Sequence, residues 1–258
     1  MQKTVLLLSG TCEGRVLARA LCEAGFRVHA TVTRPETVAK FFVNPQMANA
    51  ATVEARGFTE DSLAAFLNDR DIAGVLDGTH PFAVRITRMS HAVCGQLGKP
   101  YVRYERPDWE PPADTVFVDS FAQAADVLPG LGQRVMLTIG CKQLKHFVPL
   151  QDRLLMYARI LPAEVSLAQA LQVGFRREQL VCLRPPVSLE ANRDSLRELG
   201  IEVLVTKASG REGGVVEKVQ AARELGVRVV MIRRPVLADI PTVGSVADAV
   251  RLCVETMA

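Results

Sequence analysis

Short apolar segments alternate with longer amphipathic segments along the N-terminal part of the chain. Runs rich in β-branched residues predict strands at positions 5–8, 28–32, 52–54, 75–77 and 101–104. Between them, apolar residues recur at helical spacing over positions 16–22, 63–67 and 86–94. Strands that alternate with helices form βαβ units, so we predict a parallel sheet with helices on both faces. Several strands are almost wholly apolar, as expected when both faces of a sheet are covered.

A proline-rich segment interrupts this alternation at positions 106–112. It holds three prolines, which exclude a regular helix or strand. Beyond it, strands are predicted at 135–139, 154–160, 180–183, 203–206 and 229–232, and helices at 121–128, 167–172, 189–199, 216–225 and 246–256. Ser120, Ser188 and Ser245 stand at the positions of helix N-caps. We therefore predict two Rossmann-like α/β domains with parallel sheets, residues 1–105 and 113–258, joined by 106–112, with an active-site cleft between them.

The charge balance excludes some classes of function. The chain of 258 residues carries 31 Lys and Arg against 28 Asp and Glu, a net charge of +3, and its basic residues are scattered. This mild excess does not indicate nucleic acid, but it suits an anionic small molecule if several arginines converge. No stretch approaches the roughly 18 apolar residues of a membrane helix and no signal peptide is indicated, so we expect a cytoplasmic protein. The six cysteines lie far apart without a Cys-x-x-Cys pair, so we expect reduced thiols and no metal site.

A loop with two glycines follows the first strand at positions 9–15 (S-G-T-C-E-G-R) and leads into the first helix. Glycines let the backbone approach a ligand closely, and the N–H groups at a helix start attract phosphate. The segment matches neither G-x-G-x-x-G nor the P-loop, so a tight strand–helix turn is also compatible with it. The candidate cofactor-binding residues here are Gly10, Thr11, Glu13 and Gly14.

The end of the second strand bears on the choice of cofactor. In dinucleotide-binding folds an acidic residue at this place binds the ribose 2′-hydroxyl, but this chain has T-V-T-R-P at 31–35, with no carboxylate. Arg34 can instead form a charge-assisted contact with a 2′-phosphate, which favours NADPH over NADH. The alternative is a solvated surface arginine.

Two further segments combine polar and aromatic residues. Positions 77–83 (D-G-T-H-P-F-A) follow the fourth strand, at the sheet edge where ligands bind, so Thr79, His80 and Pro81 are candidate cofactor contacts. A hydrogen-bonded structural histidine is the alternative. Positions 101–109 (Y-V-R-Y-E-R-P-D-W) alternate aromatic residues with Arg103 and Arg106. They form either a platform for a flat anion or a half-buried strand and hinge.

The second half carries its own glycine-rich loop at positions 206–214 (T-K-A-S-G-R-E-G-G), between a strand and a helix. Its glycines, hydroxyl and cations are typical of an anion-binding loop, although a flexible surface loop also explains the glycines. Lys142, which begins a turn after another strand, either contacts substrate or is a surface lysine. The candidates in the loop are Lys207, Ser209, Gly210 and Arg211.

Taken together, these motifs resemble those of the precorrin-6A reductase family. The matching segments are S-G-T-C-E-G-R, T-R-P, D-G-T-H-P-F-A, P-Y-V-R-Y-E-R-P-x-W and T-K-A-S-G-R-E-G-G-x-x-E-K, which span nearly the whole chain in the family's order. The resemblance implies an NADPH-dependent oxidoreductase of cobalamin biosynthesis. It would transfer a hydride to C19 of the precorrin-6A macrocycle, with a proton added at C18, and so give precorrin-6B. The first domain would bind the dinucleotide, and the second would contribute to the substrate and nicotinamide site.

The resemblance also implies roles for the site residues. The substrate is a polycarboxylate tetrapyrrole that needs several cations, and the candidates are Arg103, Arg106, Lys142, Lys207 and Arg211. His80 and Lys207 are the candidate catalytic residues, either for positioning or for supplying the proton. Ser209 and Gly210 join the cofactor contacts. We expect a monomer whose partner is the small-molecule corrinoid, with neither nucleic acid nor membrane involved.

Three alternatives stay open. A sister branch of the family reduces the cobalt-loaded substrate of the oxygen-independent pathway, and the sequence does not separate the two branches. A regulatory α/β protein would bind NADP without turnover. A relative of the sugar-nucleotide epimerases is disfavoured, because no Tyr-x-x-x-Lys pair occurs.

Overall fold

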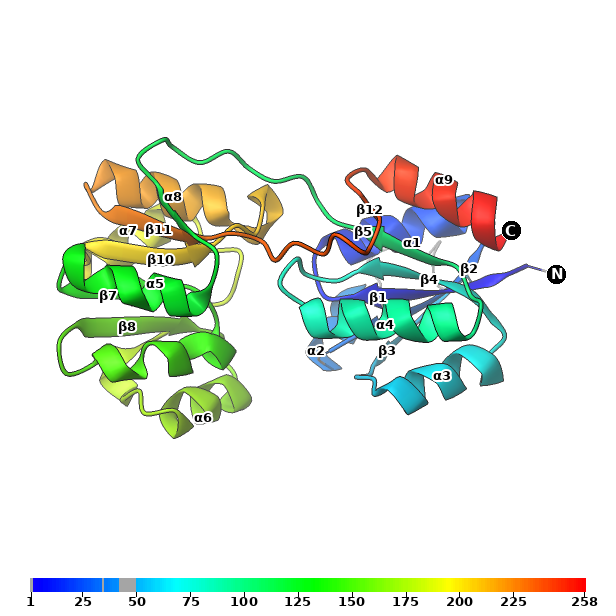
Figure 1. Cartoon of the computed structure of the whole chain (residues 1–258), viewed down its shortest axis with the longest axis horizontal. Helices are drawn as coiled ribbons and strands as arrows, with labels where there is room; N and C mark the ends of the chain where they lie inside the picture. The colour runs from blue at the N-terminus through cyan, green and yellow to red at the C-terminus, as the bar shows by residue number, and fades with distance from the viewer. Residues whose placement is uncertain (1, 34, 42–49) are drawn as a thin grey trace. The chain divides into compact units, whose positions relative to one another are not determined.

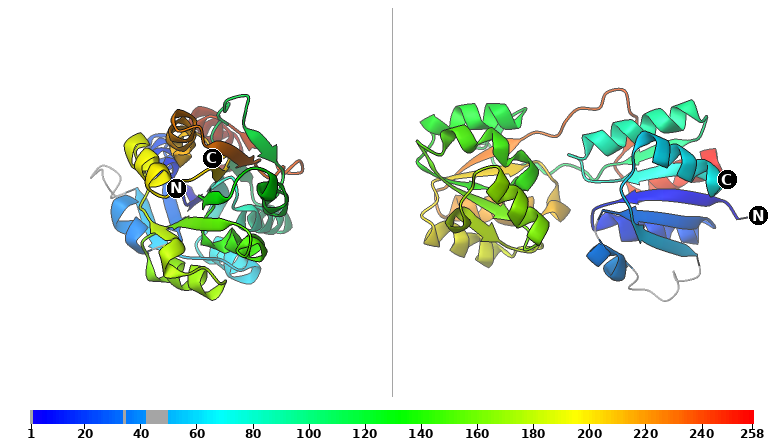
Figure 2. Two further views of the ribbon diagram at one scale, coloured as in Figure 1. Left: turned by 90° about the vertical axis from the view of Figure 1, so that its left-hand side faces the viewer. Right: turned by 90° about the horizontal axis from the view of Figure 1, so that it is seen from below.

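The computed structural model describes residues 2–33, 35–41 and 50–258. The chain forms two compact units: residues 1–107 with 236–258, and residues 108–235. Each unit is built on a six-stranded sheet whose paired strands are all parallel (Figure 1, Figure 2). The predicted fold class, α/β with two parallel sheets, is confirmed. No helix of these described residues is long and apolar enough to cross a membrane.

The first unit reverses its strand order at the centre of the sheet. The order is β12-β5-β4-β1-β2-β3, so the chain proceeds from β1 toward one edge and returns to β4 on the other side of β1. Ligands of open parallel sheets bind beyond the carboxyl ends of the strands at such a reversal. The strands are β1 (Thr4–Ser9), β2 (Arg27–Val32), β3 (Ala51–Ala55), β4 (Ile72–Gly78), β5 (Tyr101–Tyr104) and β12 (Thr242–Val243). The helices are α1 (Glu13–Glu23), α2 (Pro35–Phe41), α3 (Glu60–Asp69), α4 (Val84–Gln96) and α9 (Val246–Met257).

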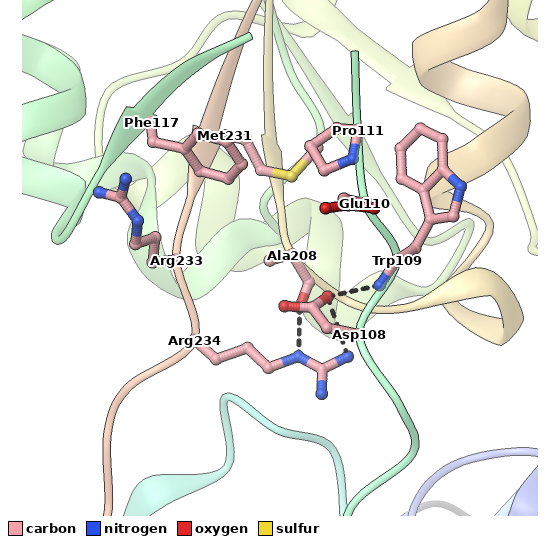
Figure 3. Close-up of a pocket in the computed structure, with 9 residues that line it drawn as sticks. All are labelled: Asp108, Trp109, Glu110, Pro111, Phe117, Ala208, Met231, Arg233 and Arg234. Atoms are coloured by element: carbon pink, nitrogen blue, oxygen red, sulfur yellow. Dashed lines mark hydrogen bonds and ion pairs between the residues drawn. The ribbon is translucent and has the colours of Figure 1, made fainter. Parts of the chain in front are cut away.

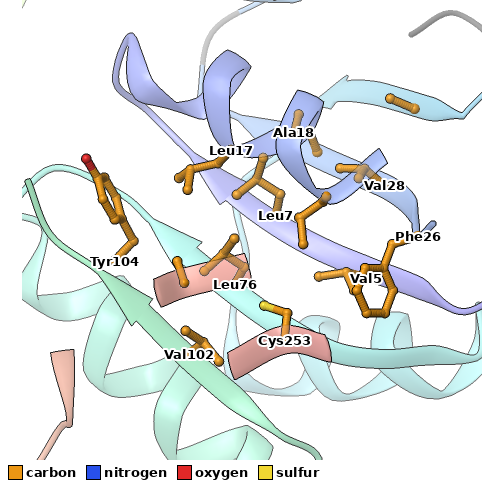
Figure 4. Close-up of a cluster of buried hydrophobic side chains, with 14 of the residues drawn as sticks. Val5, Leu7, Leu17, Ala18, Phe26, Val28, Leu76, Val102, Tyr104 and Cys253 are labelled. Atoms are coloured by element: carbon orange, nitrogen blue, oxygen red, sulfur yellow. The ribbon is translucent and has the colours of Figure 1, made fainter. Parts of the chain in front are cut away.

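Alternate residues of β1 serve two separate cores. Leu7 belongs to a buried cluster that includes Leu17 of α1 and Cys253 of α9 (Figure 4). Leu6 belongs to a second buried cluster, which includes Leu63 of α3 and residues of α4. Because successive side chains of a strand point to opposite faces, a strand covered on both sides is apolar at every position.

The second unit has the same kind of reversal, between β7 and β10, in the order β6-β11-β10-β7-β8-β9. Helices α7 and α8 pack on one face through a cluster that includes Leu196, Leu204 and Val219. The strands are β6 (Val116–Val118), β7 (Arg134–Leu137), β8 (Leu155–Ile160), β9 (Leu180–Cys182), β10 (Val203–Lys207) and β11 (Arg228–Ile232). The helices are α5 (Phe121–Val127), α6 (Glu164–Gln172), α7 (Leu189–Glu198) and α8 (Val215–Glu224), with short 3₁₀ turns η2 (Leu128–Gly130), η3 (Cys141–His146), η4 (Val148–Leu150), η5 (Arg177–Gln179) and η6 (Arg211–Gly213).

The division of the chain differs from the expected one at its C-terminal end. Residues 113–258 were expected to form one domain, but 236–258 belong to the first unit. Strand β12 pairs with β5 through Thr242 and Val243, and α9 contributes to the core of the first sheet. Neither β12, β6 nor α2 was predicted. The predicted N-cap serines are confirmed, because Ser120, Ser188 and Ser245 each accept a hydrogen bond from the backbone N–H three residues further along the chain.

Candidate functional site

The loops after β1 and β4 lie side by side at the carboxyl edge of the first sheet. Ser9 and Gly78, the last residues of the two strands, are partners in register, and Thr11 Oγ1 donates to the Gly78 carbonyl at 3.2 Å. Thr79 and His80 follow directly. The structure therefore brings the predicted cofactor residues of both loops to one edge, where the strand order reverses.

The two glycines of the first loop have different surroundings. A Cβ added at Gly10 would meet nothing within 4 Å in the described part of the chain, so the backbone there is open to a ligand. A Cβ at Gly14 would lie 1.8 Å from Ser9 Oγ and 2.8 Å from Ser9 Cβ. Gly14 is therefore needed for the close packing of α1 against the end of β1, whereas Gly10 leaves room for a phosphate group at the helix start.

Glu13 and Arg106 form a buried ion pair near this loop. Arg106 Nη1 lies 2.7 Å from Glu13 Oε1, and both residues are buried. Burial by itself would raise the pKa of Glu13, but hydrogen bonds from Thr11 and its own backbone, and then the Arg106 charge, hold it below its usual value. Glu13 was predicted to contact the cofactor and Arg106 the substrate. The structure pairs these two residues with each other, and their contacts with cofactor and substrate stay predictions.

Arg103 lies inside the first unit, where it is 1% exposed. Its Nη1 lies 2.9 Å from Asp77 Oδ1 and donates to Thr79 Oγ1 at 3.0 Å, and its Nη2 donates to Glu105 at 3.3 Å. The Tyr101 hydroxyl donates to the other Asp77 oxygen at 2.7 Å. Burial and then the Asp77 charge raise the pKa of Tyr101, so this hydroxyl stays protonated. The network fixes the turn after β4, so the arginine predicted to bind substrate supports the loop that carries Thr79.

The next residue along that loop is His80. Its Nδ1 accepts a hydrogen bond from the Phe82 backbone N–H at 3.1 Å. A neutral ring whose Nδ1 is an acceptor carries its proton on Nε2, so Nε2 is the donor in any contact with a ligand. Pro81 is buried in the turn that leads into α4.

The remaining predicted cations lie at the carboxyl edge of the second sheet. Lys207 is the last residue of β10, is half-buried, and has its pKa lowered by burial to about 8. Lys142 is exposed in η3, which follows β7, and β7 is the sheet neighbour of β10. Arg211 is exposed in η6. The predicted cations of the second unit therefore share one edge, again at a reversal of strand order.

The loop after β10 contains a left-handed glycine, a short 3₁₀ turn and an internal hydrogen bond. Gly210 has a φ of 75°, a conformation that favours glycine, and η6 follows it. Ser209 is buried, and its hydroxyl donates to the Gly213 carbonyl at 3.5 Å. The loop closes on itself in this way before α8 begins.

A cavity of about 590 Å³ adjoins this loop in the second unit (Figure 3). Arg234 donates from Nε to the Ala208 carbonyl at 2.9 Å, and its Nη2 lies 3.4 Å from Asp108. The Arg233 guanidinium lies 4.6 Å from the centre of the Phe117 ring. The cavity combines apolar walls with two arginines and two carboxylates, Asp108 and Glu110. Its lining residues are Asp108, Trp109, Glu110, Pro111, Phe117, Ala208, Met231, Arg233 and Arg234.

Sequence reasoning placed Asp108, Trp109, Glu110 and Pro111 in the proline-rich joint, with Trp109 in the possible platform for a flat anion, but it assigned no role to Arg233 and Arg234. Arg233 and Arg234 follow a predicted strand and precede Pro235, as Arg34 follows the second strand and precedes Pro35. That repeated strand–Arg–Pro pattern was the signal that could have found them. Arg34 itself lies outside the described residues, and its role stays a prediction.

These features define an α/β protein of the doubly wound class, with a glycine-containing loop at the carboxyl edge of each sheet. Within that class the chain belongs to the family described as Precorrin-6x reductase CbiJ/CobK, whose model matches residues 4–254.

Individual relatives cover nearly the same span. The chain is 37% identical over 249 residues to the "Precorrin-6A reductase" of Mycobacterium tuberculosis, with 95% of each chain covered. It is 35% identical over 235 residues to the "Cobalt-precorrin-6A reductase" of Synechocystis, covering 90% of this chain and 88% of that one. A solved structure titled "CobK precorrin-6A reductase" has the same fold, with a TM-score of 0.76 and 24% identity over 100% of this chain and 98% of its own.

Proposed function

We propose that this protein is a precorrin-6A reductase that uses NADPH to form precorrin-6B in cobalamin biosynthesis. The observation that carries the proposal is similarity along the whole chain: 95% of it aligns with the relative named precorrin-6A reductase, at 37% identity. The family match over residues 4–254 includes every predicted site residue.

The carboxyl edge of the first unit suits NADPH. The open backbone at Gly10 and the N–H groups at the start of α1 can hold the pyrophosphate, with Thr11 beside them. Gly14 permits the turn that brings this helix start to the edge. Arg34, which follows β2 by two positions in the sequence, would bind the 2′-phosphate. Thr79, His80 and Pro81 would then contact the nicotinamide half of the cofactor, because they follow the strand next to β1.

The cations at the carboxyl edge of the second unit suit the carboxylates of the substrate. Lys142 and Arg211 are exposed, and Lys207, the last residue of β10, is half-buried. Charge-assisted hydrogen bonds from such groups recognise carboxylates strongly. Arg103 and Arg106 support the first unit through ion pairs with Asp77 and Glu13, so we assign their charges to that unit's structure.

When bound, NADPH supplies the hydride, which we assign to C19 of the macrocycle. The protein's own part is to bind the ligands, orient them and hold a proton. His80 is the side chain that we assign to the C18 proton, because the Phe82 N–H at Nδ1 leaves the proton on Nε2.

Steady NADPH oxidation that depends on precorrin-6A tests this function. The assay should use the substrate both metal-free and loaded with cobalt, because relatives of both names align with the chain. Turnover of either substrate supports a reductase and identifies its branch. Tight NADP binding without turnover of either substrate would contradict the proposal and favour a regulatory protein.

A further inference from the structure

A cluster of polar residues to which no role has been assigned lies in the second unit, under the helices α7 and α8. One of its members is an arginine that a neighbouring side chain holds in place. Arg159, from β8, donates from Nη1 to Asn192 Oδ1 at 2.6 Å. Asn192, on α7, is 1% exposed, and its Nδ2 donates to the carbonyls of Val187 and Ser188 at 3.1 and 2.8 Å. The amide is thus fixed with its oxygen toward Arg159, and the guanidinium is held in one position.

Strand register places a threonine level with this arginine. Val205 of β10, Leu137 of β7 and Ala158 of β8 are partners across three neighbouring strands. The residues that follow Val205 and Ala158 are Thr206 and Arg159, so both lie on the opposite face of the sheet. That face is the one that α7 and α8 cover, since Leu204 packs in their cluster.

Buried polar atoms of this cluster lack partners. Thr206 is 0% exposed, and its Oγ1 has no hydrogen-bond partner among the residues that the structure describes. The same holds, within that part of the chain, for Nε of Arg159 and Oε2 of Glu217. Buried polar groups are nearly always paired, so unpaired buried donors on the same face of a sheet, from β10 and β8 on either side of β7, indicate a ligand that pairs them.

A lysine of α8 adds to the positive charge. Burial, and then the charges of Arg159 and Lys207, lower the pKa of Lys218 to about 7, while Glu217 acts in the opposite direction. Burial likewise lowers the pKa of Lys207 to about 8 and that of Arg159 to about 10. These cations repel one another because the nearby carboxylate does not balance them, and a bound anion would relieve the repulsion.

We propose that Arg159, Thr206 and Lys218, with Asn192 as the residue that positions Arg159, form a carboxylate-binding site in the second unit. Its ligand is one acidic side chain of the substrate, an identification that rests on the proposed function. A carboxylate there accepts hydrogen bonds from Arg159 Nε, the Thr206 hydroxyl and the Lys218 ammonium group. It thereby supplies the partner that the two buried donors lack.

The test is a titration of the protein with precorrin-6A in the absence of NADPH, in which binding is measured through the absorbance of the macrocycle. Lys218→Met removes the charge and keeps the length of the side chain. Arg223→Met, which removes an exposed cation from the same helix, is the matched control. At about pH 6, Lys218→Met should weaken binding by roughly 10-fold or more, the loss expected for one charged hydrogen bond. Arg223→Met should bind as the wild type does.

The pH dependence supplies a second readout. The charged groups that act on Lys218 are Arg159, Lys207 and Glu217, and Cys141 acts on Lys207. Both lysine pKa values are lowered, so the lysines are charged below about pH 7 and lose their protons as the pH rises through about 7 and 8. Wild-type affinity should therefore fall between about pH 6 and 9, and Lys218→Met should show a shallower fall. Equal affinity and equal pH dependence in the two proteins would overturn the proposal.

Thermal unfolding and a second ligand separate the remaining outcomes. Without an anion the Lys218 charge opposes folding, so Lys218→Met should melt at the same or a higher temperature at about pH 6. A lower melting temperature together with weak binding would assign Lys218 a structural role and overturn the proposal. Citrate is titrated in parallel as a simple polycarboxylate. If the wild type binds citrate through Lys218 but binds no precorrin-6A, the proposed substrate is wrong while the anion site stands.

Discussion

Arg103 and Asp77 form an ion pair inside the first unit, with Nη1 2.9 Å from Oδ1 and side chains 1% and 0% exposed. The same Nη1 donates to Thr79, so the pair connects β5 to the turn that carries His80. The position of the candidate cofactor loop therefore depends on a buried charge pair between β4, the neighbour of β1, and β5.

Replacing Arg103 by Met should destabilise the protein. The substitution leaves Asp77 buried without its counter-charge, which costs about 3 to 5 kcal/mol. Urea unfolding followed by circular dichroism measures the loss. Arg88→Met, an exposed arginine of α4, is the control and should change stability by less than about 0.5 kcal/mol. If Arg103→Met left stability unchanged and only raised the Michaelis constant for substrate, Arg103 would be a substrate ligand after all.

The role of Arg103 shows what sequence patterns could not provide. The strand at 101–104 and the presence of a cation were both predictable, but the cation's environment depends on β4 and β12, which pair on either side of β5. Strand β12 consists of two residues, so it leaves no periodic signal of its own. The C-terminal helix was predicted from its periodicity, but its packing on the first sheet was not, because that contact is long-range.

In the candidate site, too, some features could be predicted from the sequence and others could not. Loops at the carboxyl ends of β1 and β4 in the first sheet, and of β10 in the second, were predictable, because parallel strands bring such loops to one edge of their own sheet. The partners of Glu13 and Arg106 were not, since the pairing joins residues 93 positions apart. Lys218, on α8, was part of a matched motif, but only the fold shows that the charge of Arg159, on β8, acts on it.

Gly10 and Gly14 should respond differently to a side chain. Gly10→Val places its side chain in open space, so stability should hold while NADPH binding weakens by about 10-fold or more, through loss of the close approach to phosphate. Gly14→Val forces atoms against Ser9 and should cost about 1 to 3 kcal/mol of stability. Isothermal titration with NADPH and thermal unfolding of both variants separate the two effects. Unchanged NADPH affinity in Gly10→Val would remove this loop from the cofactor site.

Arg34 should select NADPH over NADH. Arg34→Ala removes a charged hydrogen bond to the 2′-phosphate and should cost about 1 to 3 kcal/mol of NADPH affinity. NADH affinity should hardly change, because that cofactor has no phosphate at this position. Titration of both cofactors against the wild type and the variant measures the difference. An equal loss of affinity for NADPH and for NADH would show that Arg34 does not bind the 2′-phosphate.

His80→Ala should lower turnover by about 10- to 100-fold, the loss expected for one positioning or acid group. Binding of NADPH and of substrate should persist, because both ligands keep their charged contacts. Turnover is measured in H₂O and D₂O, since a proton delivered by His80 gives a solvent isotope effect that the variant should alter. Unchanged turnover and an unchanged isotope effect would exclude His80 from the proton step.

The central claim is that this protein transfers a hydride from NADPH to precorrin-6A, and isotope transfer tests it most directly. The protein is incubated with precorrin-6A and NADPH carrying deuterium at the transferable position of nicotinamide C4, and the product is analysed by mass spectrometry and NMR. The account predicts one deuterium per product molecule, located at C19, with C18 protonated from solvent. A product without deuterium, or deuterium at another carbon, would contradict it.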